Sequence, residues 1–147
     1  MSAVIERADI LQLVPQQGAM CLLDSILDWD AQHLRARGSD PSAPAHPLRA
    51  HARLGSAVAL EYAAQAAAAH GALLGARAVA HPAQAGGTAL LASARALTLL
   101  DLRLDACAQA LTVEVRRLHA EGGAALYEFE LAAGALLARG RLSLLLV

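Results

Sequence analysis

The sequence predicts an α+β fold in which one antiparallel sheet wraps around a single long helix. An apolar, alanine-rich stretch over residues 56–74 is long enough for a helix of about five turns. Four strand-like runs follow it in succession between residues 90 and 146. Consecutive strands after one buried helix favour α+β over alternating parallel strands and helices. With 147 residues, 56% of them hydrophobic, the chain fits one domain with one core over residues 1–147.

The part before the long helix predicts a short helix, two strands and a loop. Apolar residues have helical spacing over residues 8–13, and Pro15 ends that helix. Residues 21–30 and 34–37 are expected to be two strands joined by a polar turn. Residues 39–53 contain three prolines and are predicted to be a long loop, a kind of segment that often carries function.

The long helix is expected to begin with Ser56 as its N-cap and to end near Gly75. Its small side chains make it thin, so a sheet can wrap closely around it. A second loop is predicted over residues 80–88. One curled sheet leaves an edge or a face uncovered, and dimerisation is the usual cover. The strands after that loop are expected at residues 90–100, 111–119, 124–132 and 136–146.

Composition argues against several classes of function. A formal net charge of -1 without a basic stripe argues against nucleic-acid binding. The N-terminal residues lack the order of a secretion signal, and Cys21 and Cys107 have no CxxC spacing, so we expect a cytoplasmic protein with free thiols. Glu61 interrupts the apolar helix and would cost about 3 kcal/mol in a bilayer, so no membrane span is expected.

Glu61 is the most informative residue, because its neighbours in the helix are apolar. An ionised carboxylate there needs a partner or a polar cavity. Gln65 lies one turn later on the same face and can hydrogen-bond the carboxylate. Isolated ionisable groups in apolar settings cluster at functional sites, so we expect Glu61 to be catalytic or to bind a ligand.

His46, in the proline-rich loop, is the second candidate, since an imidazole base and a carboxylic acid together suit the elimination of water. His51 in the same loop is a rival. His70 lies two and a half turns beyond Glu61 and is expected to serve packing or capping. No spacing typical of a metal site, a phosphate-binding loop or a nucleophile elbow occurs, so no metal is expected.

Two segments resemble the hot-dog-fold 3-hydroxyacyl-ACP dehydratases. In the first, a short helix ends at Pro15 and leads into an apolar strand with Asp24. The second is the helix segment Leu60-Glu61-Tyr62-Ala63-Ala64-Gln65-Ala66, which is similar to that family's Glu-x-x-x-Gln signature. The likeness covers nearly the full length.

The resemblance is closest to the aryl-polyene-type predicted 3-hydroxylacyl-ACP dehydratases, where a His-Pro-Leu sequence precedes such a helix. Here that sequence is His46-Pro47-Leu48. The chain departs from the better-known fatty-acid enzymes at Pro15-Gln16-Gln17, where they carry Pro-His-Arg. It also has Leu54-Gly55-Ser56 where they place proline and glycine before the helix.

This resemblance implies dehydration of a (3R)-hydroxyacyl thioester on acyl carrier protein to the trans-2-enoyl thioester, in fatty-acid or polyene-type synthesis. His46 would be the base, and Glu61, oriented by Gln65, the acid. Backbone N–H groups at Gly55 and Ser56 would bind the enolate oxygen.

The resemblance also implies no cofactor beyond the carrier's phosphopantetheine arm. In that family the histidine and the glutamate of one site come from different subunits. A homodimer, a higher oligomer or a heteromer with a related dehydratase is therefore expected. An acidic carrier needs a basic landing patch, and the candidates are Arg95, Arg103, Arg116 and Arg117.

Two alternatives remain open, because fold alone does not separate them. One is a hot-dog acyl-thioester hydrolase in which Glu61 activates water; it should survive the loss of His46. The other is a non-catalytic partner subunit of a dehydratase complex, which would bind carrier or partner but show no turnover alone.

Overall fold

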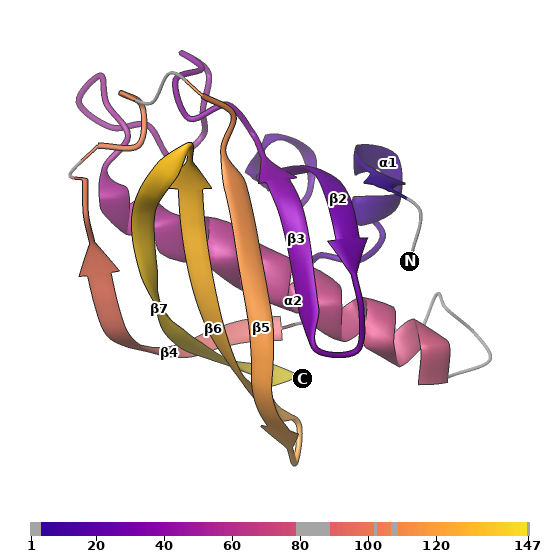
Figure 1. The fold of residues 1–147 in the computed structure, drawn as a ribbon. Coiled ribbons are helices and arrows are strands. Elements are labelled where there is room, and N and C mark those ends of the chain that lie inside the picture. The colour runs from indigo at the N-terminus through magenta and orange to yellow at the C-terminus, as the bar shows by residue number, and fades with distance from the viewer. Residues whose placement is uncertain (1–3, 79–88, 102, 107–108, 147) are drawn as a thin grey trace.

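The computed structural model describes residues 4–78, 89–101, 103–106 and 109–146. In this part of the chain, seven antiparallel strands form one sheet, in the order β1-β2-β3-β5-β6-β7-β4. One long helix, α2 (Ala59–Ala78), lies across a face of the sheet (Figure 1). The strands are β1 (Ile5–Glu6), β2 (Leu23–Trp29), β3 (His33–Gly38), β4 (Ala89–Leu99), β5 (Thr112–Glu121), β6 (Ala124–Ala133) and β7 (Ala135–Leu146).

The predicted α+β arrangement is confirmed, and the six expected strands are present within about two residues of their predicted bounds. The short helix α1 (Arg7–Ile10) continues as hydrogen-bonded turns to Val14, close to the predicted 8–13. Strand β1 was not predicted, because two residues are too few to leave an alternating pattern. The predicted loop over residues 80–88 lies outside the described residues.

The prediction that Ser56 caps the long helix is wrong. A 3-10 turn, η2 (Ser56–Val58), precedes α2, and Gly55 occupies the capping position with extended backbone. No side chain caps the turn, and Ser56 is itself buried as its first residue. The first helical turn therefore begins one residue earlier than a serine cap would place it, and its N-cap residue gives it no side-chain hydrogen bond.

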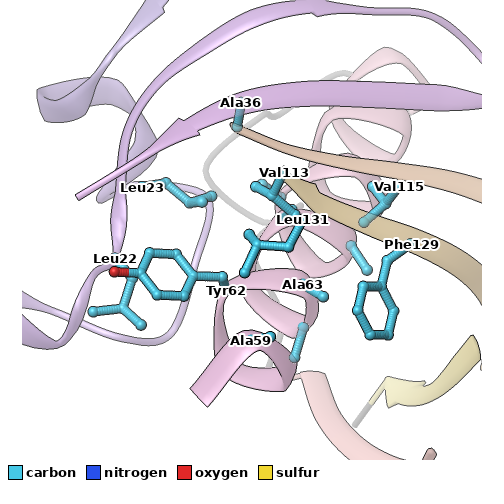
Figure 2. Close-up of a cluster of buried hydrophobic side chains, with 14 of the residues drawn as sticks. Leu22, Leu23, Ala36, Ala59, Tyr62, Ala63, Val113, Val115, Phe129 and Leu131 are labelled. Atoms are coloured by element: carbon cyan, nitrogen blue, oxygen red, sulfur yellow. The ribbon is translucent and has the colours of Figure 1, made fainter. Parts of the chain in front are cut away.

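The core lies between α2 and the concave face of the sheet. Every residue from Tyr62 to His70 is buried, so α2 is enclosed on most sides. This follows from its composition, since alanine side chains let strands approach the helix closely. The inward side chains of the sheet close over the helix in Figure 2, and they include Ala36, Val113, Val115, Phe129 and Leu131.

Within the described ranges, strand β4 pairs with β7 alone and so forms one edge of the sheet. Leu90, Leu91 and Leu97 on this strand are 50%, 44% and 39% exposed, and Leu100 just beyond it is 57% exposed. An exposed apolar edge is a template for pairing with another chain. Among the described helices, none combines the length and apolar character needed to cross a bilayer.

Candidate active site

Glu61 lies in the first turn of α2 and is half-buried. Its Oε1 accepts two amide hydrogen bonds, from Gln65 Nε2 at 2.8 Å and from Gln16 Nε2 at 3.3 Å. Within the described part of the chain, Oε2 carries no hydrogen bond. The two oxygens of this carboxyl group are therefore unequal, because two amide groups hold Oε1 and neither holds Oε2.

Gln65 determines which oxygen of Glu61 is held. Its side chain is fully buried, and its Oε1 accepts the backbone N–H of Leu22 at 2.7 Å. This bond orients the amide, so Nε2 donates to Met20 O and to Glu61, both at 2.8 Å. The predicted contact between Gln65 and Glu61 is present, and it also ties α2 to the chain leading into β2.

Gln16 is a site residue that sequence reasoning missed, although the sequence comparison singled out its position as a departure from the fatty-acid enzymes. Its Nε2 reaches Glu61 across 45 residues of chain. Its Oε1 is buried and has no hydrogen-bond partner among the described residues. Buried acceptors are nearly always paired in folded proteins, so this oxygen marks a place for a donor beside Glu61.

His46 is only 6% exposed and contacts α2 through the residue next to Glu61. Its Nε2 is 3.0 Å from Tyr62 Oη, and its Nδ1 accepts the backbone N–H of Leu48 at 3.1 Å. Tyr62 Oη in turn donates to Ser39 O at 3.0 Å. Burial, and to a lesser degree the charge of Arg49, lowers the pKa of His46, so the imidazole is neutral near pH 7.

The structure gives His46 and Glu61 separate sets of partners within one chain. His46 bonds Tyr62 and the Leu48 backbone, whereas Glu61 bonds Gln65 and Gln16. Adjacent residues on a helix point about 100° apart, so the two networks lie on different faces of the first turn of α2. The catalytic role of His46 therefore stays a prediction.

Gly55 and Ser56 stand at the entry to α2, as the sequence places them. Gly55 is exposed with extended backbone and forms an isolated bridge with Arg103. A side chain at Gly55 would meet nothing within 4 Å, so its immediate surroundings are open. The first backbone N–H groups of a helix can bind an anion in such an opening.

Charged side chains connect the loop before α2 to the segment after β4. Arg103 donates to Asp105 through Nε at 3.0 Å and Nη2 at 2.6 Å, and the pKa of the Asp105 carboxyl is lowered mainly by this pairing. Arg49 Nη1 lies 3.8 Å from the same carboxyl. Two of the arginines predicted as a carrier patch have acidic partners. Arg103, which bridges to Gly55, is paired with Asp105. Arg116 lies on the outer face of the sheet, with its Nε 4.0 Å from Glu128 Oε1.

The remaining polar features do not form a competing centre. His70 is fully buried and bonds Tyr127 and the Asp30 backbone, which confirms its packing role. The described residues contain no group of histidine, cysteine and acidic side chains that could hold a metal ion. A hollow of about 440 Å³ lies against the outer face of β5, β6 and β7; its lining is mostly charged and includes neither His46 nor Glu61.

Comparisons with known proteins agree with this fold and with each other. A family model described as ApeP-like, ApeP dehydratase, matches residues 8–146. A chain of the dehydratase heterocomplex ApeI:P from Xenorhabdus doucetiae is similar with a TM-score of 0.80 and 18% identity, covering 94% of this chain and 90% of that one. The search of curated proteins found no match.

Two thioesterase structures are also similar. For thioesterase HI1161 from Haemophilus influenzae the TM-score is 0.59 at 14% identity, with 95% of this chain and 89% of that chain covered. For a hypothetical thioesterase with coenzyme A from Streptococcus pneumoniae the TM-score is 0.57 at 10% identity, with 83% and 84% covered. At these identities the likeness establishes the fold, and it confirms the predicted hot-dog fold.

Proposed function

The chain belongs to the family of ApeP-like dehydratases, and from that premise we propose that it takes part in the dehydration of a 3-hydroxyacyl thioester on acyl carrier protein. The observation that carries the proposal is the unequal carboxyl group of Glu61. Two amide donors hold Oε1, while Oε2 has no hydrogen bond in the described part of the chain. A carboxylic acid held in this way carries its proton on Oε2, where a substrate hydroxyl can receive it.

In the proposed reaction the C2–H and C3–O bonds of the substrate break and a C2=C3 double bond forms. A base takes the C2 proton, and Glu61 Oε2 gives its proton to the departing hydroxyl, which leaves as water. Glu61 is then a carboxylate, stabilised by the N–H groups of Gln65 and Gln16. Oε1 of Gln16 has no hydrogen-bond partner among the described residues, so we propose it as the acceptor for the 3-hydroxyl before that group leaves.

The thioester oxygen gains negative charge as the C2 proton leaves. The backbone N–H groups at Gly55 and Ser56 are the proposed donors to it, since they lie at the start of the helical segment. The dipole of α2 favours negative charge at this end. Glu61 lies in the first turn of the same helix. The start of this helix would therefore stabilise the enolate oxygen and also give a proton to the leaving hydroxyl.

We further propose that the working unit contains a second hot-dog subunit, either a copy of this chain or a related dehydratase. The exposed leucines of the β4 edge support this. The similar structure from Xenorhabdus doucetiae is a dehydratase heterocomplex, which supports the mixed assembly. In either case the acyl chain would enter between subunits, and no cofactor beyond the carrier's arm is needed.

Hydrolysis of the thioester is the competing activity, because two thioesterases share the fold. A half-buried carboxylate with a free oxygen can activate water as well as deliver a proton. The two reactions differ in their products. Dehydration gives a 2-enoyl thioester, whereas hydrolysis releases a free thiol.

The experiment is to isolate the affinity-tagged chain from its own cells, with any bound subunit, and to supply a 3-hydroxyacyl thioester of acyl carrier protein. Absorbance of the 2-enoyl thioester and release of free thiol are followed together. We expect enoyl formation, and a loss of about 10²- to 10⁴-fold in Glu61→Gln. Glu121→Gln is the control, because that carboxylate is 81% exposed at the far end of β5 and should leave the rate unchanged.

Each other outcome contradicts the dehydratase proposal in a distinct way. Thiol release without enoyl formation would identify a hydrolase. Enoyl formation that Glu61→Gln does not slow would make the chain a non-catalytic partner of an active subunit.

A further inference from the structure

The hydrogen bonds around His46 fix the position of its ring proton. A backbone N–H can only donate, so the bond from Leu48 N requires a lone pair on Nδ1. The proton of the neutral imidazole is therefore on Nε2. The proton of the Tyr62 hydroxyl goes to Ser39 O, a carbonyl that can only accept, so Tyr62 Oη receives the Nε2–H of His46.

These directions agree with the surroundings of both groups. Burial raises the pKa of Tyr62 to about 12, so its hydroxyl keeps the proton that it gives to Ser39. Burial lowers the pKa of His46, so its ring stays neutral with one proton and one lone pair. The order of donors is thus His46 Nε2–H to Tyr62 O–H to Ser39 O=C.

A general base needs a free lone pair directed at the proton that it removes. Nε2 of His46 carries a hydrogen, and the lone pair of Nδ1 is occupied by Leu48 N–H. Proton uptake at Nδ1 would break that turn and place two N–H groups against each other in a site where the histidine is 6% exposed. The imidazole therefore donates a hydrogen bond through Nε2, and neither ring nitrogen has a free lone pair for the substrate proton.

We propose that His46 is a positioning residue that donates a hydrogen bond to Tyr62, and that another group removes the C2 proton. This rests on the proposed dehydratase function. By holding Tyr62, His46 fastens the proline-rich loop to the first turn of α2, where the next residue back is Glu61. Tyr62 cannot shift easily, because its ring also lies against Gly38, where an added Cβ would come within 2.8 Å of it.

The test separates a donor from a base by using His46→Gln. The amide Nε2 of glutamine reaches about as far as the Nε2 of histidine and can donate to Tyr62, but the amide has no basic lone pair. For the complex isolated from its own cells, we expect kcat/KM in His46→Gln to stay within about tenfold of wild type, with the same pH profile. His46→Ala lacks the donor and should lose activity that His46→Gln restores.

A catalytic base would give a different result. His46→Gln would then lose about 10²- to 10⁴-fold in kcat, like His46→Ala, and the limb of the pH profile that reports the base would disappear. That result overturns the proposal. If wild type shows no dehydration, or if Glu61→Gln has no effect on the rate, the proposed function fails instead. The role of His46 as a donor is then decided by the protonation of its ring nitrogens, which can be measured without an activity assay.

The second measurement is the ¹⁵N NMR spectrum of the imidazole nitrogens near neutral pH. We expect a protonated Nε2 and an unprotonated Nδ1 for His46, and Tyr62→Phe should shift the Nε2 signal. The opposite tautomer, or a charged ring, overturns the proposal. Denaturation in urea gives a further check, since His46→Gln should keep most of the unfolding midpoint that His46→Ala loses.

Discussion

Gly38 is the residue on which the placement of Tyr62 depends. A Cβ at this position would lie 2.8 Å from Cε1 and 2.9 Å from Cδ1 of the Tyr62 ring. The ring is fully buried and its hydroxyl is bonded at the far end, so it has no room to move aside. We therefore expect Gly38→Ala to lower the free energy of unfolding by about 1–3 kcal/mol, measured by urea denaturation.

Gly71 is the matched control for this prediction. It lies in α2, and a Cβ there would meet nothing within 4 Å. Gly71→Ala should raise the free energy of unfolding by about 1 kcal/mol, because alanine favours the helix. Equal effects of the two substitutions would contradict the contact between Gly38 and Tyr62.

For single residues, the sequence indicates a candidate site where a polar side chain lies among apolar neighbours. Glu61 and Gln65 stand out as polar residues in an apolar helix, and the structure joins them by a hydrogen bond. Gln16 did not stand out as a partner of Glu61, because the contact joins residues 45 positions apart and leaves no local pattern. Tyr62 gave a weak signal only, as a large polar-ended ring among alanines, and its bonds to His46 and Ser39 depend on the path of the loop.

His70 joins three elements, and its titration should affect their assembly. Its Nε2 is 2.8 Å from Asp30 O, beyond the end of β2, and its Nδ1 is 2.7 Å from Tyr127 Oη on β6. The Asp30 carbonyl only accepts, so Nε2 donates and Nδ1 receives the tyrosine proton. Burial lowers the pKa of His70 below 6.5, outweighing the Asp30 carbonyl, which raises it; the charges of Arg117 and His33 lower it slightly further.

The lowered pKa gives a pH dependence of known sign. The unfolded chain binds the proton more readily, so the contribution of His70 to stability is present above pH 6.5 and is lost as pH falls toward its folded pKa. We expect the free energy of unfolding to fall between about pH 7.5 and 5.5, and to fall less in His70→Gln. Urea denaturation at the two values measures it. Parallel changes in both proteins would contradict the assignment.

The comparison with wild type isolates His70 from other histidines. Burial also lowers the pKa of His46, which adds a change of the same sign. The pKa of His33 is raised, chiefly by its bond to Asp30, so that residue contributes stability that is lost as pH rises. His70→Gln leaves both groups in place.

The elements were predictable where a period of side chains repeats. Strands β5 and β6 alternate clearly in sequence, and the structure buries alternate residues over residues 113–115 and 127–131. The alanine-rich helix was predictable by length and composition, while its exact start was not. Ser56 suggested a cap, but the bridge between Gly55 and Arg103 sets the backbone there, and a contact across 48 residues leaves no local pattern.

At the scale of the whole molecule, α2 covers the concave face of the sheet, and β4 has no second strand beside it among the residues that the structure describes. In the described part of the chain, this edge therefore combines a strand that is paired on one side with exposed apolar side chains. Soluble proteins protect such edges with charge, proline or short strands, yet β4 is eleven residues long and presents leucines. The order of strands that creates this edge was beyond sequence reasoning, since pairing between β4 and β7 is not sequential.

A charge on this edge should separate the subunits. We expect the purified protein to be an oligomer, and the double substitution Leu91→Lys with Leu97→Lys to reduce its mass toward the 15.2 kDa of one chain. Lysine on an edge strand opposes pairing because its charge would be buried where the two subunits meet. Light scattering after gel filtration measures the mass. Leu118→Lys is the control, because Leu118 is 40% exposed on the interior strand β5. An unchanged mass would mean that the subunits meet at another surface. The rate of dehydration by the same variant would then show whether activity depends on a subunit that pairs with β4.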